Sequence, residues 1–244
     1  MSTFFSGAIS FSPGGPSGIG CSSRIPGYVE ADALHTTHGR AIAFATGIKT
    51  ADPDLTVIVF TGDGDCVGIG GNHFIHAARR NVDLTVICIN NFNYGMTGGQ
   101  VSPTTPADKW TTTTPYGNIE APFDISRLAI GAGAPYVARW CTGYPYETVQ
   151  AIAEGLRKPA FAFVELLVPC PTGFGKRNEM PEGRDAWGWY KKNTILRSKY
   201  EALDPEAKDA EPRIVVGELQ NLDRPEFTAG WRELTERARS RIRK

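Results

Sequence analysis

The sequence predicts an α/β protein with a doubly wound, mostly parallel β-sheet and helices on both of its faces. Two observations support this fold class. Apolar segments of strand length alternate along the chain with segments of helical periodicity. The clearest strand segments, residues 55–60 and 84–89, are apolar throughout rather than at every second position, which is typical of parallel strands covered on both sides.

The predicted elements follow one another in a regular order. A helix over residues 36–50 and an Asp52-Pro53-Asp54 turn lead to the strand at 55–60. A Gly/Asp-rich turn, a helix over 70–80 and the strand at 84–89 then complete a βαβ unit. Beyond this unit we expect a helix over 123–133, a short strand at 136–138, a helix over 146–157 and a buried strand over 160–168.

Composition divides the chain into three predicted regions. Residues 1–17 are rich in Ser, Gly and Pro and are expected to lack regular structure. Residues 18–198 are expected to form one domain. Residues 199–244 are expected to be a C-terminal extension that packs on the domain or on a partner. Within this extension we expect a loop over 199–212, a small edge strand at 214–216 and a basic helix over 229–243.

Charge and hydropathy narrow the class of partner. The chain has 26 Lys plus Arg and 26 Asp plus Glu, so no charge excess favours binding to nucleic acid or to a membrane surface. Its apolar runs are shorter than the ~20 residues that a membrane-spanning helix needs, and residues 1–17 lack a signal-peptide pattern. We therefore expect a cytoplasmic protein that binds proteins and small molecules.

Polar residues follow both strands of the βαβ unit. Gly62-Asp63-Gly64-Asp65 follows the first strand, and Asn90-Asn91 closes the second. A right-handed βαβ unit places these two strand ends side by side, at the edge where open α/β sheets bind ligands. One carboxylate and one amide oxygen can therefore meet on Mg²⁺, which shares its oxygen ligands with phosphates. The glycines Gly62 and Gly64 let the backbone approach those phosphates closely.

Gly-Asp-Gly alone is typical of an ordinary turn. Here a buried strand precedes it, and an Asn pair follows at a spacing of roughly 30 residues. These features together match the fingerprint of proteins that bind thiamine diphosphate through magnesium.

One tract carries a closer resemblance. From Gly62 to Pro106 the chain reads GDGDCVGIGGNHFIHAARRNVDLTVICINNFNYGMTGGQVSPTTP, which resembles the β subunit of 2-oxoacid:ferredoxin oxidoreductases. The resemblance also includes residues 18–24, His38-Gly-Arg40 and residues 169–175, and it extends over residues 18–235. Its most specific part is Asn91 to Gln100. The resemblance implies a thiamine diphosphate-binding fold.

The resemblance also implies roles for individual residues. Asp63, Asn91 and the backbone carbonyl of Asn93 would be the magnesium ligands. Cys21 and Ser22 would approach the cofactor. Further residues would surround the diphosphate, namely Gly62, Asp63, Gly64, Asp65, Gly95, Met96 and Thr97.

Two further residues are candidates for contacts with the thiamine ring and the substrate. His38 would line the thiamine pocket, although it could instead serve only as a helix cap. Arg24 is the candidate for the substrate carboxylate, because a guanidinium can bind a carboxylate through two parallel hydrogen bonds. The alternative for Arg24 is an ordinary surface arginine.

By the same resemblance, the enzyme would oxidatively decarboxylate a 2-oxoacid to an acyl-CoA, using coenzyme A and passing electrons to ferredoxin. A partner α subunit would supply the activating glutamate, so the chain would be active only as a heterodimer. Residues 98–106 and Arg24 favour 2-oxoglutarate, while branched and aromatic 2-oxoacids stay open. The alternatives are a subunit of a non-redox thiamine-dependent decarboxylase or carboligase, and a non-catalytic cofactor-binding scaffold.

The cysteines depart from the family pattern. Many members bind a [4Fe–4S] cluster through an N-terminal Cys-Pro-x-Cys-Gly motif and two later cysteines. Cys21 and Cys170 match the later pair, but residues 1–17 contain no cysteine, and a cubane cluster normally needs four thiolates. We expect either a truncated version of a longer gene product or a divergent subunit without its cluster. The other cysteines, Cys66, Cys88 and Cys141, are weak substitutes, and Cys88 is predicted to be a core thiol.

Overall fold

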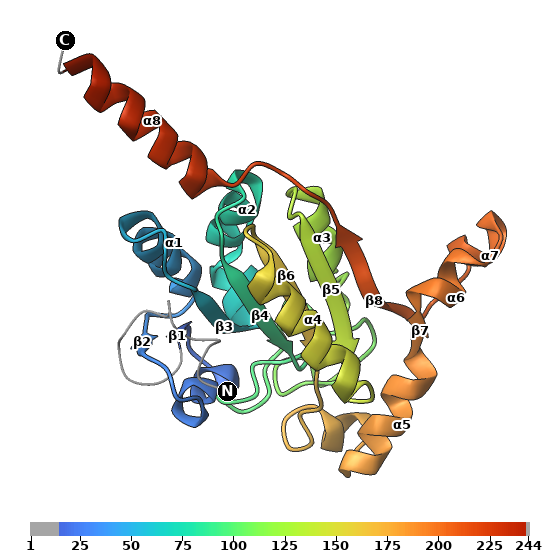
Figure 1. The fold of residues 1–244 in the computed structure, drawn as a ribbon. Coiled ribbons are helices and arrows are strands. Elements are labelled where there is room, and N and C mark those ends of the chain that lie inside the picture. Colours follow the sequence, from blue (N-terminus) through green and yellow to red (C-terminus); the bar gives the residue numbers. More distant parts are fainter. Residues whose placement is uncertain (1–14, 243–244) are drawn as a thin grey trace.

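The computed structural model describes residues 15–242. Its sheet has eight strands in the order β2-β1-β3-β4-β6-β5-β8-β7 (Figure 1). All neighbouring strands pair in parallel except β5 and β8, which confirms the mostly parallel, doubly wound sheet. The strands are β1 (Gly15–Ser17), β2 (Ala33–His35), β3 (Ile58–Gly62), β4 (Thr85–Asn90), β5 (Tyr136–Cys141), β6 (Ala162–Leu167), β7 (Thr194–Leu196) and β8 (Ile214–Asn221).

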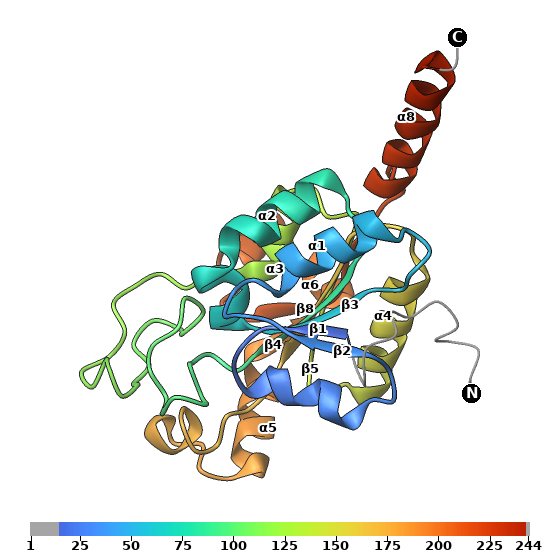
Figure 2. The same cartoon turned by 90° about the vertical axis from the view of Figure 1, so that its left-hand side faces the viewer.

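Helices cover both faces of the sheet, as the sequence predicted. One face carries α1 (Ala41–Ala51), α2 (Gly71–Arg80) and α3 (Ile125–Gly131), and the other carries α4 (Pro145–Arg157) (Figures 1 and 2). A hydrophobic core lies on each face of the sheet, and successive strand residues point alternately into one core and the other. In β6, Phe163 packs on the side of α1 to α3 and Val164 on the side of α4. Burial on both sides explains the continuous apolar runs.

The unit β3–α2–β4 places two strand ends side by side. The strands pair in parallel from Ile58 opposite Thr85 to Gly62 opposite Ile89. A plain turn was predicted after β3, but residues Gly64–Ile69 form a π-helical segment, η2. Glycine is required at its start, because a Cβ on Gly64 would lie 2.2 Å from Cε1 of Tyr94. Such π-helical turns are frequent at functional sites.

The N-terminal prediction is wrong in part. Residues Gly15–Ser17 form β1, which pairs with both β2 and β3, although residues 1–17 were expected to be irregular. Residues 1–14 lie outside the described part of the chain. The helix predicted from residue 36 begins instead at Ala41, because Gly39 adopts a left-handed φ of 71° that interrupts helical geometry.

The C-terminal region is more regular than predicted. The expected loop at 199–212 contains two short helices, α6 (Arg197–Glu201) and α7 (Pro205–Asp209); Asp204 caps α7 through the N–H of Ala207. The expected edge strand is the longer β8, which lies between β5 and β7 and is therefore an inner strand. The division of the chain at residue 198 stays a prediction.

The ends of the parallel strands carry further helices. The 3₁₀ segment η1 (Cys21–Tyr28), η3 (Gly175–Asn178) and α5 (Gly183–Asn193) were not predicted, and η1 and α5 lie toward the carboxyl ends of β4, β5 and β6 (Figures 1 and 2). Helix α8 (Phe227–Ile242) projects away from the sheet at the opposite end (Figure 1). Within residues 15–242 no helix has the length and apolar character needed to cross a membrane.

Candidate active site

Asp63 lies directly after β3, and its side chain is only 2% exposed. Its Oδ2 accepts hydrogen bonds from Ser102 Oγ at 2.5 Å and Thr104 Oγ1 at 2.6 Å. Both hydroxyl groups bind the same oxygen, so Oδ1 is free of both. The arrangement fixes the carboxylate while leaving one oxygen for another ligand.

Burial raises the pKa of Asp63, and the hydrogen bonds from Ser102 and Thr104 oppose this shift only in part. Asp63 forms no ion pair with any residue in the described part of the chain. Its partners are neutral groups. A bound cation would supply the opposite charge and would favour the ionised carboxylate.

Asn91 and Asn93 extend this polar strand end. The backbone of Asn91 contacts Asp63, and Asn93 Nδ2 donates to the Asn91 carbonyl at 3.0 Å. Within the described residues, Asn93 Oδ1 is the only buried side-chain polar atom without a hydrogen-bond partner. Such an unpaired oxygen costs about 1–3 kcal/mol. It therefore indicates a ligand that coordinates oxygen or donates a hydrogen bond.

The carbonyl of Asn93, the predicted third magnesium ligand, already accepts the N–H of Gly95 at 3.0 Å. It retains a second lone pair, but the unsatisfied oxygen is the side-chain Oδ1. Two glycines surround this oxygen. A Cβ on Gly95 would lie 3.2 Å from both Asn93 Oδ1 and Cys170 Sγ, and a Cβ on Gly173 would lie 3.1 Å from the same two atoms. The space beside Asn93 therefore depends on glycine.

The predicted diphosphate residues Gly95, Met96 and Thr97 lie in a tight loop. The N–H of Tyr94 donates to the Gln100 carbonyl at 3.0 Å and closes it. The Thr97 hydroxyl donates to Gln100 Oε1 at 2.6 Å, so it is held within the loop. The structure thus brings these residues close to Asn93. Their contact with a diphosphate stays a prediction.

A buried hydrogen-bond network connects Asp63 to the strands β4, β5 and β6. Thr104 Oγ1 also lies 3.0 Å from Asn90 Oδ1, and Asn90 Nδ2 donates to Glu165 Oε1 at 2.8 Å. Glu165 in turn pairs with Arg139 Nε at 2.8 Å. Sequence reasoning missed this network. The sequence did contain an indication of it, because the charged residues Arg139 and Glu165 interrupt the otherwise apolar strands β5 and β6.

Segment η1 holds the predicted substrate-side residues. Ser22 is buried beside β3, where a Cβ on Gly62 would lie 3.7 Å from its hydroxyl. Cys21 is exposed as a whole residue, but its thiol is partly buried; this partial burial, followed by the nearby Cys170 and Asp63, raises the pKa of the thiol. Arg24 is exposed and forms no ion pair with the described residues. Cys21 and Cys170 are therefore near enough to influence each other electrostatically, whereas Arg24 has no ion-pair partner within residues 15–242.

The thiols do not fit a complete [4Fe–4S] cluster. Cys21 and Cys170 share one neighbourhood, but the described residues contain no metal-binding group of three or more His, Cys, Asp or Glu side chains. The other three cysteines, Cys66, Cys88 and Cys141, are buried. Burial and the neighbouring Cys66 raise the pKa of Cys88, as expected for a core thiol.

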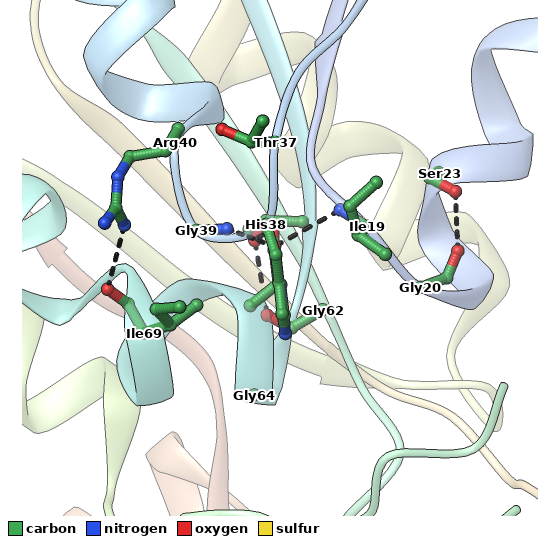
Figure 3. Close-up of polar contacts among 12 residues, drawn as sticks. Ile19, Gly20, Ser23, Thr37, His38, Gly39, Arg40, Gly62, Gly64 and Ile69 are labelled. Atoms are coloured by element: carbon green, nitrogen blue, oxygen red, sulfur yellow. Dashed lines mark hydrogen bonds and ion pairs between the residues drawn. The ribbon is translucent and has the colours of Figure 1, made fainter. Parts of the chain in front are cut away.

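His38 and Asp65 contact each other directly, with 2.5 Å between Nδ1 and Oδ1. Figure 3 shows His38 between Gly39 and Ile19. Asp65 was predicted to contact the cofactor. Both of its oxygens instead hydrogen-bond to protein groups, to Thr61 through Oδ2 and to His38, Gly39 and Ile19 through Oδ1. Any contact of Asp65 with the cofactor stays untested.

Comparison with known proteins places this geometry in a family. The thiamine pyrophosphate enzyme family, C-terminal TPP binding domain, matches residues 18–166. The 2-oxoglutarate synthase subunit KorB of Methanocaldococcus jannaschii is 55% identical over 224 residues, covering 92% of this chain and 82% of the relative. The 2-oxoacid:ferredoxin oxidoreductase subunit beta of Saccharolobus solfataricus is 47% identical over 161 residues, covering 64% of this chain and 52% of the relative.

A solved structure shows the same architecture. The 2-oxoglutarate:ferredoxin oxidoreductase from Magnetococcus marinus, with 2-oxoglutarate, coenzyme A and succinyl-CoA bound, aligns with a TM-score of 0.80 and 35% identity. The alignment covers 91% of this chain and 76% of that chain. The chain therefore belongs to the thiamine pyrophosphate enzyme family and, within it, to the β subunits of the 2-oxoacid:ferredoxin oxidoreductases.

Proposed function

We propose that the chain binds thiamine diphosphate through Mg²⁺ and, together with an α subunit, oxidatively decarboxylates 2-oxoglutarate to its acyl-CoA, with electrons passed to ferredoxin. The observation that carries the metal site is the buried Asn93 Oδ1 without a partner among the described residues, close to the Asp63 carboxylate, which the backbone of Asn91 contacts. The names of the relatives support the substrate and the reaction.

Asp63, Asn91 and Asn93 would hold the magnesium ion. Carboxylate and amide oxygens suit this cation, which completes a sphere of about six oxygens with phosphates and water. The loop from Gly95 to Thr97 would then face the diphosphate. When it is bound, the cofactor supplies the carbanion chemistry at the 2-oxoacid carbonyl.

The other residues of this chain orient these groups. Ser102 and Thr104 hold Asp63 Oδ2, and Asn90 links Thr104 to the buried Glu165. On the substrate side, the exposed Arg24 is available for a substrate carboxylate, because it has no partner among the described residues. A dicarboxylic substrate benefits from such a cation.

An α subunit would cover the exposed side of the site. The loop between β4 and α3 carries large exposed apolar side chains, with Tyr116 at 98% and Ile119 at 97% exposure. Its first part supplies Ser102 and Thr104 to Asp63, so the loop borders the metal site. Exposed apolar clusters of this kind are typical of protein interfaces. We place the complex in the cytoplasm.

The test uses co-expressed α and β chains with several 2-oxoacids, coenzyme A and a one-electron dye. We expect dye reduction that depends on coenzyme A, with the highest kcat/KM for 2-oxoglutarate. Release of carbon dioxide without dye reduction would favour the non-redox decarboxylase or carboligase. Cofactor binding without turnover of any 2-oxoacid would favour the scaffold.

A further inference from the structure

Phe92 adopts a backbone conformation that is unfavourable for phenylalanine. It lies between the predicted metal ligands Asn91 and Asn93, and its φ is 61°. In this left-handed region the Cβ crowds the backbone, so the conformation persists only where the surroundings enforce it. Because Phe92 separates the two ligands, its backbone angles set how they point relative to each other. The groups that hold Phe92 therefore bear directly on the proposed metal site.

Contacts on both sides of the residue and around its ring hold Phe92 in this conformation. Its N–H donates to Asn90 Oδ1 at 3.1 Å, which closes a turn from a side chain to the backbone two residues later. Its carbonyl accepts the Thr105 hydroxyl at 2.7 Å. Its ring is 4% exposed and packs against Phe174 and Tyr190. Asn90 is the last residue of β4, so its contact sets the direction in which the chain leaves the strand.

The amide of Asn90 can hold Phe92 in only one orientation. A backbone N–H can only donate, so the side-chain atom that faces Phe92 must be the amide oxygen. The same oxygen accepts the Thr104 hydroxyl at 3.0 Å. On the other side, Nδ2 donates to Glu165 Oε1 at 2.8 Å. A reversed amide would place two donors against each other at Phe92 and two acceptors against each other at Glu165.

Glu165 is itself held in place by a neighbouring strand and a helix. It lies directly opposite Arg139 in the register of β5 and β6. Its Oε2 accepts Arg139 Nε at 2.8 Å and the Ser126 hydroxyl at 2.6 Å, which leaves Oε1 for Asn90. Arg139 also pairs with Asp124. The carboxylate therefore meets the Asn90 amide as an acceptor of fixed position.

Stability alone does not explain why this ion pair is buried. Glu165 is 2% exposed and Arg139 is 4% exposed, between strands in the interior of the sheet. Taking two charges out of water is costly, and well-packed apolar residues of similar volume often stabilise a fold as well or better. Apolar residues cannot orient an amide, however. The contact with Asn90 gives the buried pair a role that apolar residues could not perform.

We propose that Glu165 and Asn90 are positioning residues for the metal site. Glu165 fixes the Asn90 amide, and the amide oxygen holds Phe92 in its left-handed conformation. That conformation directs Asn91 and Asn93 toward the magnesium ion, in agreement with the buried Asn93 Oδ1, which has no partner among the described residues. The presence of the ion rests on the proposed function. The conformation of Phe92 does not, and it can be measured separately.

A reciprocal exchange of amide and carboxylate tests this series of contacts. Asn90→Asp alone places two carboxylates against each other. Glu165→Gln alone places two amide donors against each other, because Arg139 and Ser126 bind the oxygen of the new amide. The double variant Asn90→Asp/Glu165→Gln restores one donor and one acceptor at the same size and total charge. It should therefore rescue what either single variant loses.

The first readout is hydrogen exchange at the Phe92 amide. It is followed by NMR of the full chain labelled with ¹⁵N-phenylalanine, without metal or cofactor and with Phe92→Tyr for assignment. In the parent this N–H is bonded to Asn90 and should be protected. Each single variant should lose protection roughly tenfold, and the double variant should regain it. Equal protection in the parent and all variants, or no protection in the parent, would overturn the proposal.

The second readout is the apparent magnesium affinity of the full chain at saturating thiamine diphosphate, measured by calorimetric titration. Each single variant should bind magnesium roughly 10-fold more weakly, as for other residues that orient a metal ligand. The double variant should return to within about threefold of the parent. If the two losses instead add in the double variant, Glu165 does not act through Asn90 and the proposal is wrong.

Asn81→Asp is the matched control, because Asn81 is also 2% exposed and left-handed, with a φ of 55°. Its amide likewise joins two segments, through the N–H of Phe161 and the carbonyl of Arg224, but it lies at the end of α2, beside the start of α8. The variant should lower the unfolding temperature, as Asn90→Asp does, and leave magnesium affinity and Phe92 protection at the parent level. An equal loss of magnesium affinity in both variants would reduce the effect of Asn90 to lost stability and overturn the proposal.

The two readouts separate this proposal from the proposed function. A parent chain that binds no thiamine diphosphate in the presence of magnesium would refute the proposed function. Hydrogen exchange at Phe92 would still decide whether Glu165 and Asn90 hold the turn.

Discussion

The strand-end region around Asp63 and the η1 region around Arg24 differ in how fully this chain completes them. At the strand ends, Asp63 and Asn93 are each 2% exposed and are surrounded by hydrogen bonds from neighbouring loops. In η1, Cys21 and Arg24 are exposed, and Arg24 forms no ion pair with the described residues. We infer that this chain builds the metal and diphosphate side of the site, and that the substrate side requires a partner.

This contrast has a physical cause. A buried carboxylate needs hydrogen bonds or a cation to offset its lost hydration, so the surroundings of Asp63 must be built into the same chain. An exposed guanidinium remains hydrated and tolerates the absence of a partner. The comparison predicts large effects on cofactor binding from the first region and smaller, substrate-specific effects from the second.

Asp63→Ala should give the largest effect. It removes the charged magnesium ligand, so magnesium-dependent thiamine diphosphate binding should weaken by more than about 100-fold, beyond the loss typical of outer-shell residues. Unfolding should not become easier, because the variant removes a carboxylate whose pKa is raised by burial. Calorimetric titration measures the cofactor affinity, and thermal unfolding measures the stability. Asp209→Ala, on exposed α7, is the matched control; equal cofactor affinity in the two variants would reject the metal site.

Thr104→Val should give the next largest effect. It removes the hydroxyl between Asp63 Oδ2 and Asn90 while keeping the side-chain shape. Apparent magnesium affinity at saturating cofactor should fall roughly 10-fold to 100-fold, as for other residues that orient a metal ligand. Thr148→Val on α4 is the control. If both variants bind magnesium equally well, the support from Thr104 is not needed.

Arg24→Ala tests the second region. Loss of one charged hydrogen-bonded contact is worth about 1.5–3 kcal/mol, so kcat/KM for 2-oxoglutarate should fall on the order of tenfold or more. Thiamine diphosphate binding should remain at the parent level. Arg24→Lys keeps the charge but cannot form two parallel hydrogen bonds, so its kcat/KM should lie between those of the parent and of Arg24→Ala. An unchanged kcat/KM in both variants would remove Arg24 from the substrate site.

The smallest effect is expected from Cys21 of the second region and from Cys170, which lies beside Asn93 in the first region. Cys21 and Cys170 supply two thiolates, so the isolated chain should hold much less than the about four irons of a cubane cluster after anaerobic reconstitution. Absorption near 400 nm should be weak, and Cys21→Ser should change it little. A brown chain with a full iron complement would show that Cys66 or Cys141 completes a cluster.

The same contrast explains what the sequence predicted. The ends of β3 and β4 were predictable, because continuous apolar runs locate parallel strands and the polar residues follow immediately. The partners of Asp63 were not, since Ser102 and Thr104 follow it by 39 and 41 positions and reach it through an irregular loop. The pairing of Asp65 with His38 was missed for the same reason, because loop paths have no periodic signal.

The C-terminal region shows a different limit. Three apolar residues at 214–216 suggested an edge strand, but β8 continues through polar residues to Asn221 and pairs with β5. An antiparallel strand with one exposed side needs no continuous apolar run. The sequence therefore did not indicate how far β8 extends.

The most direct test of the account is a calorimetric titration of thiamine diphosphate into the full chain, first with magnesium in excess and then with the metal removed by a chelator. We predict saturable binding in the presence of magnesium and no measurable binding in its absence, because in the proposed site Asp63, Asn91 and Asn93 would reach the diphosphate only through the cation. Equal affinity under both conditions, or binding under neither, would contradict it.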